Sequence, residues 1–133
     1  MNIQKAAQLT GLTPPTIRYY EKIGLIDQPV RTEGGIRDFD ETNLAQLRFV
    51  KHMRDTGMAV EPLVRYISLF READEATVSE RKKILQEQLL HMEAQIHYLT
   101  EQHEALKWKI EHYDDVMLGL GVSLEEKKKE RRQ

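Results

Sequence analysis

The sequence contains no cysteine. This absence excludes disulfides, thiolate metal sites and thiol-based sensing from the chain as it stands. Long apolar runs are missing as well, since none approaches the roughly 18 residues that a bilayer-spanning helix needs. The segment Met1–Lys5 shows no apolar signal-peptide core. We therefore expect a cytoplasmic protein that does not contact a membrane.

An excess of charge of one sign is also absent. Twenty Lys and Arg residues stand against 22 Asp and Glu residues, which gives a formal net charge of −2. This balance argues against a polycation that coats nucleic acid through its overall charge. Any DNA binding must therefore come from a local basic face. The length of 133 residues suits one modest domain with an extension.

Residues 2–23 predict two short helices separated by a tight turn. Asn2 and Thr13 are suitable N-caps, and Pro14 suits the first helical position because its missing N–H costs nothing there. Gly11 and Gly24 stand where the two helices should end. The expected apolar face of the first helix consists of Ile3, Ala6, Ala7 and Leu9. The pattern fits a helix-turn-helix or an ordinary helical hairpin, and spacing alone leaves both open.

A β-hairpin is predicted directly after these helices. The β-prone runs 30–32 and 36–39 flank a Glu33-Gly34-Gly35 turn. A hairpin in this place is a wing and favours the DNA-binding alternative. Arg31 and Arg37 stand on either side of its tip, where they could reach phosphates or a minor groove. Two solvated arginines on a small hairpin are the plainer interpretation.

Two further helices are predicted, over residues 41–56 and 61–71. Asp40 caps the first and Gly57 ends it, while Pro62 should occupy the first position of the second. Helical spacing predicts that eight apolar side chains face inward: Leu44, Leu47, Val50, Met53, Leu63, Val64, Ile67 and Phe70.

A heptad pattern dominates the rest of the chain after a polar break at 72–76. Ten positions alternate by four and three residues, and all but His103 are apolar: Leu85, Leu89, Met92, Ile96, Leu99, His103, Leu106, Ile110, Tyr113 and Met117. The pattern predicts one helix over 77–117 that is about 60 Å long. The N-terminal domain (1–71) is too small to cover it, so we expect a second copy to do so, in either direction. Residues 118–133 form a charged tail that we expect to be disordered.

Signatures of enzymes, cofactors and metals are lacking. No nucleophile–base pattern, phosphate loop or cofactor fingerprint occurs. Four histidines fall on the long helix, but separations of six, six and nine residues do not give the i, i+4 pairing typical of a helical metal site: His91, His97, His103 and His112. We therefore expect no enzymatic activity, no cofactor and no metal.

Two strings of residues resemble the MerR family of bacterial regulators. The first is Arg18-Tyr19-Tyr20-Glu21 followed by Gly24-Leu25-Ile26, and the second is Arg31 followed by the run Gly35–Phe39. The resemblance covers nearly the whole chain. Within the family the chain is most similar to the AdhR-type, aldehyde-responsive branch, through residues 49–54 and 66–70.

The resemblance implies a mainly α fold with a winged helix-turn-helix and a long antiparallel coiled-coil dimerisation helix. It further implies a homodimer that binds double-stranded promoter DNA in an overlong spacer. The dimer would distort that spacer so that RNA polymerase engages both promoter elements. A coiled-coil adaptor and a DNA-architectural factor are the competing interpretations.

The same resemblance implies roles for individual side chains. Residues 13–22 would form the recognition helix in the major groove. Base or phosphate contacts would come from Thr13, Thr16, Arg18 and Tyr19, and phosphate contacts from Arg31, Arg37 and Arg54.

The chain departs from the AdhR-type branch at one position. His52 stands where that branch has the cysteine thought to react with the inducer. Imidazole is a much weaker nucleophile than a thiolate, so direct thiol chemistry is lost there. His52 is the predicted effector position, and an ordinary surface or packing histidine is the alternative.

Overall fold

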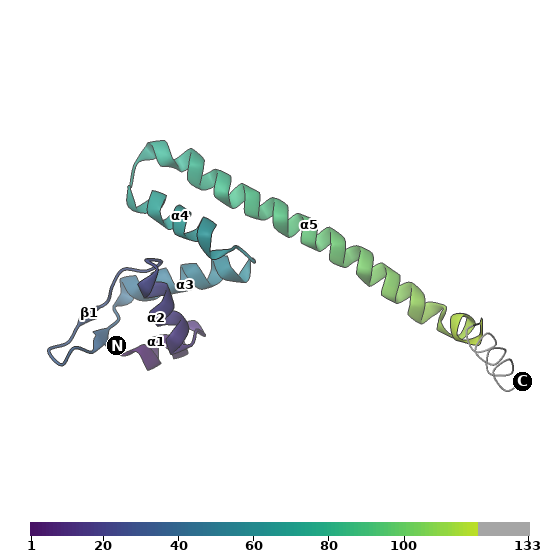
Figure 1. Ribbon diagram of the computed structural model, residues 1–133, viewed down its shortest axis with the longest axis horizontal. Helices are drawn as coiled ribbons and strands as arrows, with labels where there is room; N and C mark the ends of the chain where they lie inside the picture. The colour runs from purple at the N-terminus through teal and green to yellow at the C-terminus, as the bar shows by residue number, and fades with distance from the viewer. Residues whose placement is uncertain (120–133) are drawn as a thin grey trace, which may run out of the picture. The chain divides into compact units, whose positions relative to one another are not determined.

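The computed structural model describes residues 1–119 and has the predicted mainly α fold with a two-stranded wing (Figure 1). Residues Met1–Met92 form one compact unit, and a second unit begins at Glu93. The elements are α1 (Ile3–Thr10), α2 (Pro14–Lys22), β1 (Val30–Arg31), β2 (Arg37–Asp38), α3 (Glu41–Asp55), α4 (Val60–Arg71), the 3₁₀ helix η1 (Glu75–Thr77) and α5 (Val78–Glu111).

Local capping explains where α1 and α2 begin and end. The Asn2 side chain accepts a hydrogen bond from the N–H of Lys5 at 2.9 Å, so α1 starts as predicted. Gly11 ends α1 with φ of 74°, a left-handed conformation that favours glycine. Thr13 then caps α2, and Pro14 occupies its first position. These two helices and their turn form the predicted helix-turn-helix.

The wing is a tight antiparallel hairpin. Val30 pairs with Asp38 and Arg31 pairs with Arg37. The N–H of Gly35 donates to the Thr32 carbonyl at 2.9 Å and closes the turn, with Gly35 at φ of 79°. The glycine pair therefore predicted the turn correctly, and the two arginines lie opposite one another at its sides.

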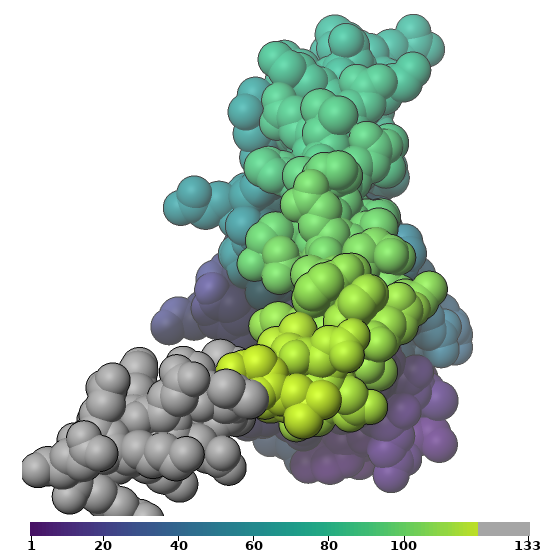
Figure 2. All heavy atoms as spheres, turned by 90° about the vertical axis from the view of Figure 1, so that its right-hand side faces the viewer, coloured from purple at the N-terminus to yellow at the C-terminus, as the bar shows by residue number. Residues whose placement is uncertain are grey.

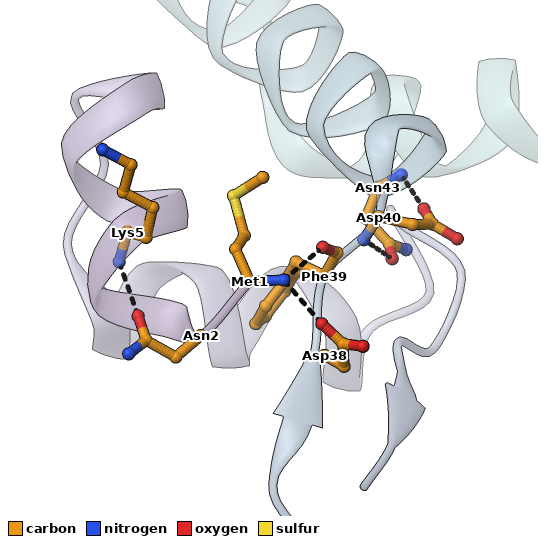
Figure 3. A network of polar contacts seen from close by, with 7 residues as sticks. All are labelled: Met1, Asn2, Lys5, Asp38, Phe39, Asp40 and Asn43. Atoms are coloured by element: carbon orange, nitrogen blue, oxygen red, sulfur yellow. Dashed lines mark hydrogen bonds and ion pairs between the residues drawn. The ribbon is translucent and has the colours of Figure 1, made fainter.

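The base of the wing is joined to the start of the chain and to α3 (Figure 3). The N–H of Phe39 donates to the Met1 carbonyl at 2.7 Å, and the Met1 amino group contacts the Asp38 carboxylate and the Phe39 carbonyl. Asp40 and Asn43 exchange side chain–backbone hydrogen bonds of 2.8 and 3.1 Å, which is a capping box at the start of α3. The wing is thus fixed at its root and exposed at its tip.

The core of the N-terminal unit lies where α2, α3 and α4 meet the segment after α2. Its fully buried large side chains are Ile17, Leu25, Ile26, Phe39, Leu47, Val50, Met58 and Leu63. Leu44, Leu47, Val50 and Met53 are all buried, as their spacing predicts. α1 packs against both α2 and α3, α3 packs against α4, and the outer face of α2 is left to solvent.

Three local predictions are wrong. Leu9 is exposed, and Thr10 is buried instead because its hydroxyl donates to the Ala6 carbonyl one turn earlier at 2.8 Å. Phe70 is 60% exposed, with the Arg81 guanidinium 5.4 Å from its ring centre. Pro62 is the third residue of α4, since Val60 begins that helix after the extended residue Ala59.

The predicted polar break at 72–76 contains structure of its own. Ala73 has φ of 51°, and the first two residues of η1 fall within the break. α5 then starts at Val78, and its first turns belong to the N-terminal unit, where Ile84 is buried and Gln88 donates to the Thr56 carbonyl at 2.9 Å. The compact unit therefore extends beyond residue 71.

The long helix is interrupted near its predicted end. α5 ends at Glu111, a turn occupies His112, and helix resumes over 113–119. Most of the predicted tail, from residue 120 on, lies outside the described residues. Among residues 1–119, no helix is long and apolar enough to cross a bilayer.

Candidate nucleic-acid interface

The exposed face of α2 carries the four residues predicted to contact DNA from this helix. Ile17 and Tyr20 are buried and hold the opposite face in the core. Thr16 is half-buried, and the other three, Thr13, Arg18 and Tyr19, are exposed. A helix that is anchored on one side and polar on the other is suited to enter a major groove.

The two threonines lie together at the N-terminus of α2. The Thr13 hydroxyl donates to the Thr16 hydroxyl at 2.9 Å and accepts from the Thr16 N–H at 3.3 Å. Pro14 and Pro15 have no N–H, and the Thr16 N–H is already bonded to Thr13, so the helix dipole and the two hydroxyls are what can favour a phosphate at this end. The two hydroxyls at this position can therefore donate to a phosphate.

A basic residue on the same face was not singled out by the sequence reasoning. Lys22 is exposed in the last turn of α2, four residues after Arg18. Side chains four apart on a helix lie above one another, so the two cations share one stripe. The i, i+4 spacing was the available signal. This stripe supplies the local basic face that the balanced composition requires.

An ion pair joins the wing to α2. The Arg37 Nε lies 2.6 Å from the Glu21 carboxylate, and the side chains are 27% and 10% exposed. Arg37, predicted as a phosphate contact, therefore also forms the ion pair that holds the wing against α2. A guanidinium has five N–H donors, so those turned away from Glu21 can still serve a phosphate. The sequence did not predict Glu21 as the partner of Arg37, because Glu21 lies on α2 and Arg37 lies on β2.

The wing tip is braced by its other arginine. Arg31 is exposed, and its Nη1 donates to the Gly35 carbonyl across the turn at 2.8 Å. This contact holds the guanidinium beside the tip. Arg31 and Arg37 thus present positive charge on the same hairpin, and Arg37 connects that hairpin to α2.

Arg54 and His52 lie elsewhere, in the last turn of α3. The Arg54 guanidinium donates to the Met58 carbonyl and so braces the turn between α3 and α4. His52 is exposed, and its carbonyl accepts the N–H of Thr56 at 3.2 Å. Among residues 1–119, no three His, Asp or Glu side chains are grouped to hold a metal ion.

Comparisons with known proteins agree with this geometry. The family model described as "MerR HTH family regulatory protein" matches residues 1–69, and the model described as "MerR, DNA binding" matches residues 44–108. The transcriptional regulator AdhR of Bacillus subtilis is 47% identical over 85 residues. That alignment covers 64% of this chain and 60% of AdhR, so the chain spans less than two thirds of that relative.

Two solved structures are similar over most of their length. A MerR family transcriptional regulator from Listeria monocytogenes is 35% identical, with a TM-score of 0.77 and 98% of each chain covered. HiNmlR, described as a MerR family regulator lacking the sensor domain and bound to promoter DNA, is 28% identical, with a TM-score of 0.74 and 86% of each chain covered.

Proposed function

Because the chain belongs to the MerR family of DNA-binding transcription regulators, we propose that it binds promoter DNA as a homodimer and controls transcription by distorting that DNA. The observation that carries this proposal is the joined surface of α2 and the wing, tied by the Arg37–Glu21 ion pair. The likeness to HiNmlR, which was crystallised on promoter DNA, supports it.

Each predicted contact residue has a role in this proposal. α2 enters the major groove, where Arg18 and Tyr19 face bases or phosphates and Thr13 and Thr16 hold the backbone. Three arginines contact phosphates: Arg31 and Arg37 from the wing, and Arg54 from the end of α3. Phosphate contacts set the register, and only the base contacts carry sequence information directly.

The dimer is proposed from the apolar stripe on the long helix. Within the second unit, Ile96, Leu99, Leu106 and Ile110 are each 60% exposed or more. Figure 2 draws the atoms of this stretch as green to yellow spheres. A stripe of this length requires a partner helix, and the same helix of a second copy is the simplest one. The antiparallel direction follows from the family resemblance.

Regulation would act through the shape of the DNA. Two linked α2–wing surfaces grip one promoter spacer that is too long, then bend and untwist it so that RNA polymerase can engage both promoter elements. The protein acts in the cytoplasm, where the promoter is, and it catalyses no reaction. His52 is the proposed effector position. A reactive thiol is absent from it, so the signal differs from direct thiol modification.

The test uses two templates that differ only in spacer length. The first carries a promoter with an overlong spacer, and the second carries the same promoter with the spacer shortened to the usual length. Purified protein with RNA polymerase should change transcription of the first template strongly and should not activate the second. Arg18→Ala serves as the matched control and should weaken the effect on the first template. An equal activation of both templates would contradict the distortion mechanism.

A further inference from the structure

An apolar groove of about 470 Å³ lies within the N-terminal unit, between α3, α4 and the segment after α2. Leu25 and Ile67 are buried in its floor, and Phe49, Tyr66 and Phe70 supply aromatic walls. The Phe49 and Tyr66 rings stack with centres 5.6 Å apart and planes inclined by 27°. The volume is in the range of small-molecule sites, and flat ring walls suit a planar aromatic guest.

A polar network borders this groove at one end. Arg71 donates through Nη1 to the Gly24 carbonyl at 2.8 Å and through Nη2 to the Asp27 carboxylate at 3.1 Å. Gln46 exchanges two hydrogen bonds of 2.9 Å with Asp27. A guanidinium has five N–H donors, so within the described chain Arg71 retains donors for a guest. The Asp27 carboxylate beside it disfavours a guest with a negative charge.

A strained residue lies on the same border. Ala73 lines the groove and has φ of 51°, a conformation that residues other than glycine rarely adopt. Its N–H donates to the Phe70 carbonyl at 3.1 Å, so the strained turn is attached directly to the aromatic wall. Strain of this kind gathers at ligand clamps and switch regions. The backbone conformation of Ala73 is an observation independent of the volume of the groove and of its aromatic side chains.

We propose that this groove binds a small, uncharged aromatic molecule carrying one hydrogen-bond acceptor, and that this binding regulates DNA recognition. The ring lies between Phe49, Tyr66 and Phe70, and the acceptor takes an N–H from Arg71. Arg71 holds the carbonyl of Gly24, just past the end of α2, so a guest that recruits its guanidinium alters how the recognition helix is held. The regulatory part rests on the proposed function, whereas the binding does not.

The binding test compares two probes with the full chain by ¹⁹F NMR. 4-Fluoroacetophenone has a ring and one carbonyl acceptor, and 4-fluoroethylbenzene has nearly the same shape without the acceptor. The ketone should bind roughly threefold to tenfold more tightly, which is the worth of one hydrogen bond. Arg71→Met should remove this preference and leave the hydrocarbon's affinity in place. Phe70→Ala, a change at an exposed side chain, should weaken both probes.

Ser68→Ala, on the exposed side of α4, is the matched control and should change neither affinity. Circular dichroism checks that each variant is folded. Two results overturn the site. In the first, neither probe binds to the full chain, which would be the case if a second copy filled the groove. In the second, the probes bind, but Phe70→Ala and Arg71→Met leave their affinities unchanged.

A separate measurement tests the regulatory part. Promoter affinity is measured with and without saturating 4-fluoroacetophenone, and we expect a change of at least threefold that Arg71→Met abolishes. An unchanged affinity with the probe bound refutes the regulation and leaves the site standing. If the protein binds no promoter DNA at all, the proposed function fails, and the NMR result still decides whether the groove is a site.

Discussion

The ion pair between Arg37 and Glu21 allows a direct test of how the wing is held. Replacing either residue with methionine keeps a side chain of similar length and removes its charge. Glu21→Met leaves the Arg37 guanidinium without its partner in a site where the two side chains are only 27% and 10% exposed. The two single variants and the double variant together form a thermodynamic cycle that isolates the energy of the pair.

The magnitude follows from the burial of the pair. Exposed pairs contribute at most about 1 kcal/mol, while breaking a fully buried pair costs roughly 3–5 kcal/mol. The pair lies between these limits, so we expect a coupling energy of about 2 kcal/mol. This corresponds to a factor of about 30 in the folding equilibrium. Urea unfolding followed by circular dichroism at one fixed protein concentration measures it.

DNA-binding measurements separate the structural role of Arg37 from its proposed contact with DNA. Glu21→Met should weaken promoter binding with an unchanged salt dependence, because it loosens the wing and removes no phosphate contact. Arg37→Met should weaken binding and also lower the salt slope by about one unit. A coupling energy below about 0.5 kcal/mol, together with normal promoter affinity of Glu21→Met, would refute the conclusion that this pair positions the wing.

Four other changes have definite expected results. Arg18→Ala should either lower the salt slope of promoter binding by about one unit or reduce discrimination between bases by roughly 1–3 kcal/mol, and unchanged affinity would exclude the proposed docking. A chain ending at Met92 should stay folded by circular dichroism and be a monomer in light scattering, in contrast to the full chain, which we propose to be a dimer. His103→Leu should raise the melting temperature of the dimer at fixed concentration, since it removes the one polar side chain of the predicted apolar stripe. His52→Cys should create a transcriptional response to formaldehyde that the unaltered chain lacks, and a formaldehyde adduct on His52 itself in mass spectrometry would speak against this.

Local chemistry made much of the N-terminal unit predictable. Asn2, Thr13 and Asp40 each cap a helix through a hydrogen bond to the backbone three residues on, so the identity of one residue determines where the helix begins. The glycines of the wing turn act in the same local way. Helices and turns whose boundaries depend on residues nearby in the sequence could therefore be predicted without knowledge of the fold.

Tertiary contacts explain what could not be predicted. The spacing of Phe70 predicts a buried side chain on the inner side of α4, yet its ring lines an open groove, and the contact from α5 is the Arg81 guanidinium, which leaves the ring 60% exposed. The partner of Arg37 and the strained turn at Ala73 also depend on elements distant in the sequence. The apolar spacing did not predict that Thr10 is buried. Its hydroxyl donates a hydrogen bond within its own helix, and this makes a polar residue acceptable in the core.

The exposed apolar stripe of the long helix has a consequence for gene dosage. When two chains must pair before they grip DNA, the number of competent molecules at low expression rises with the square of the chain concentration. Doubling the amount of protein then raises promoter occupancy about fourfold, and halving it lowers occupancy by the same factor. The side chains of Ile96 and Leu99, far along the sequence from α2, would thus determine how steeply the target gene responds to the abundance of its regulator.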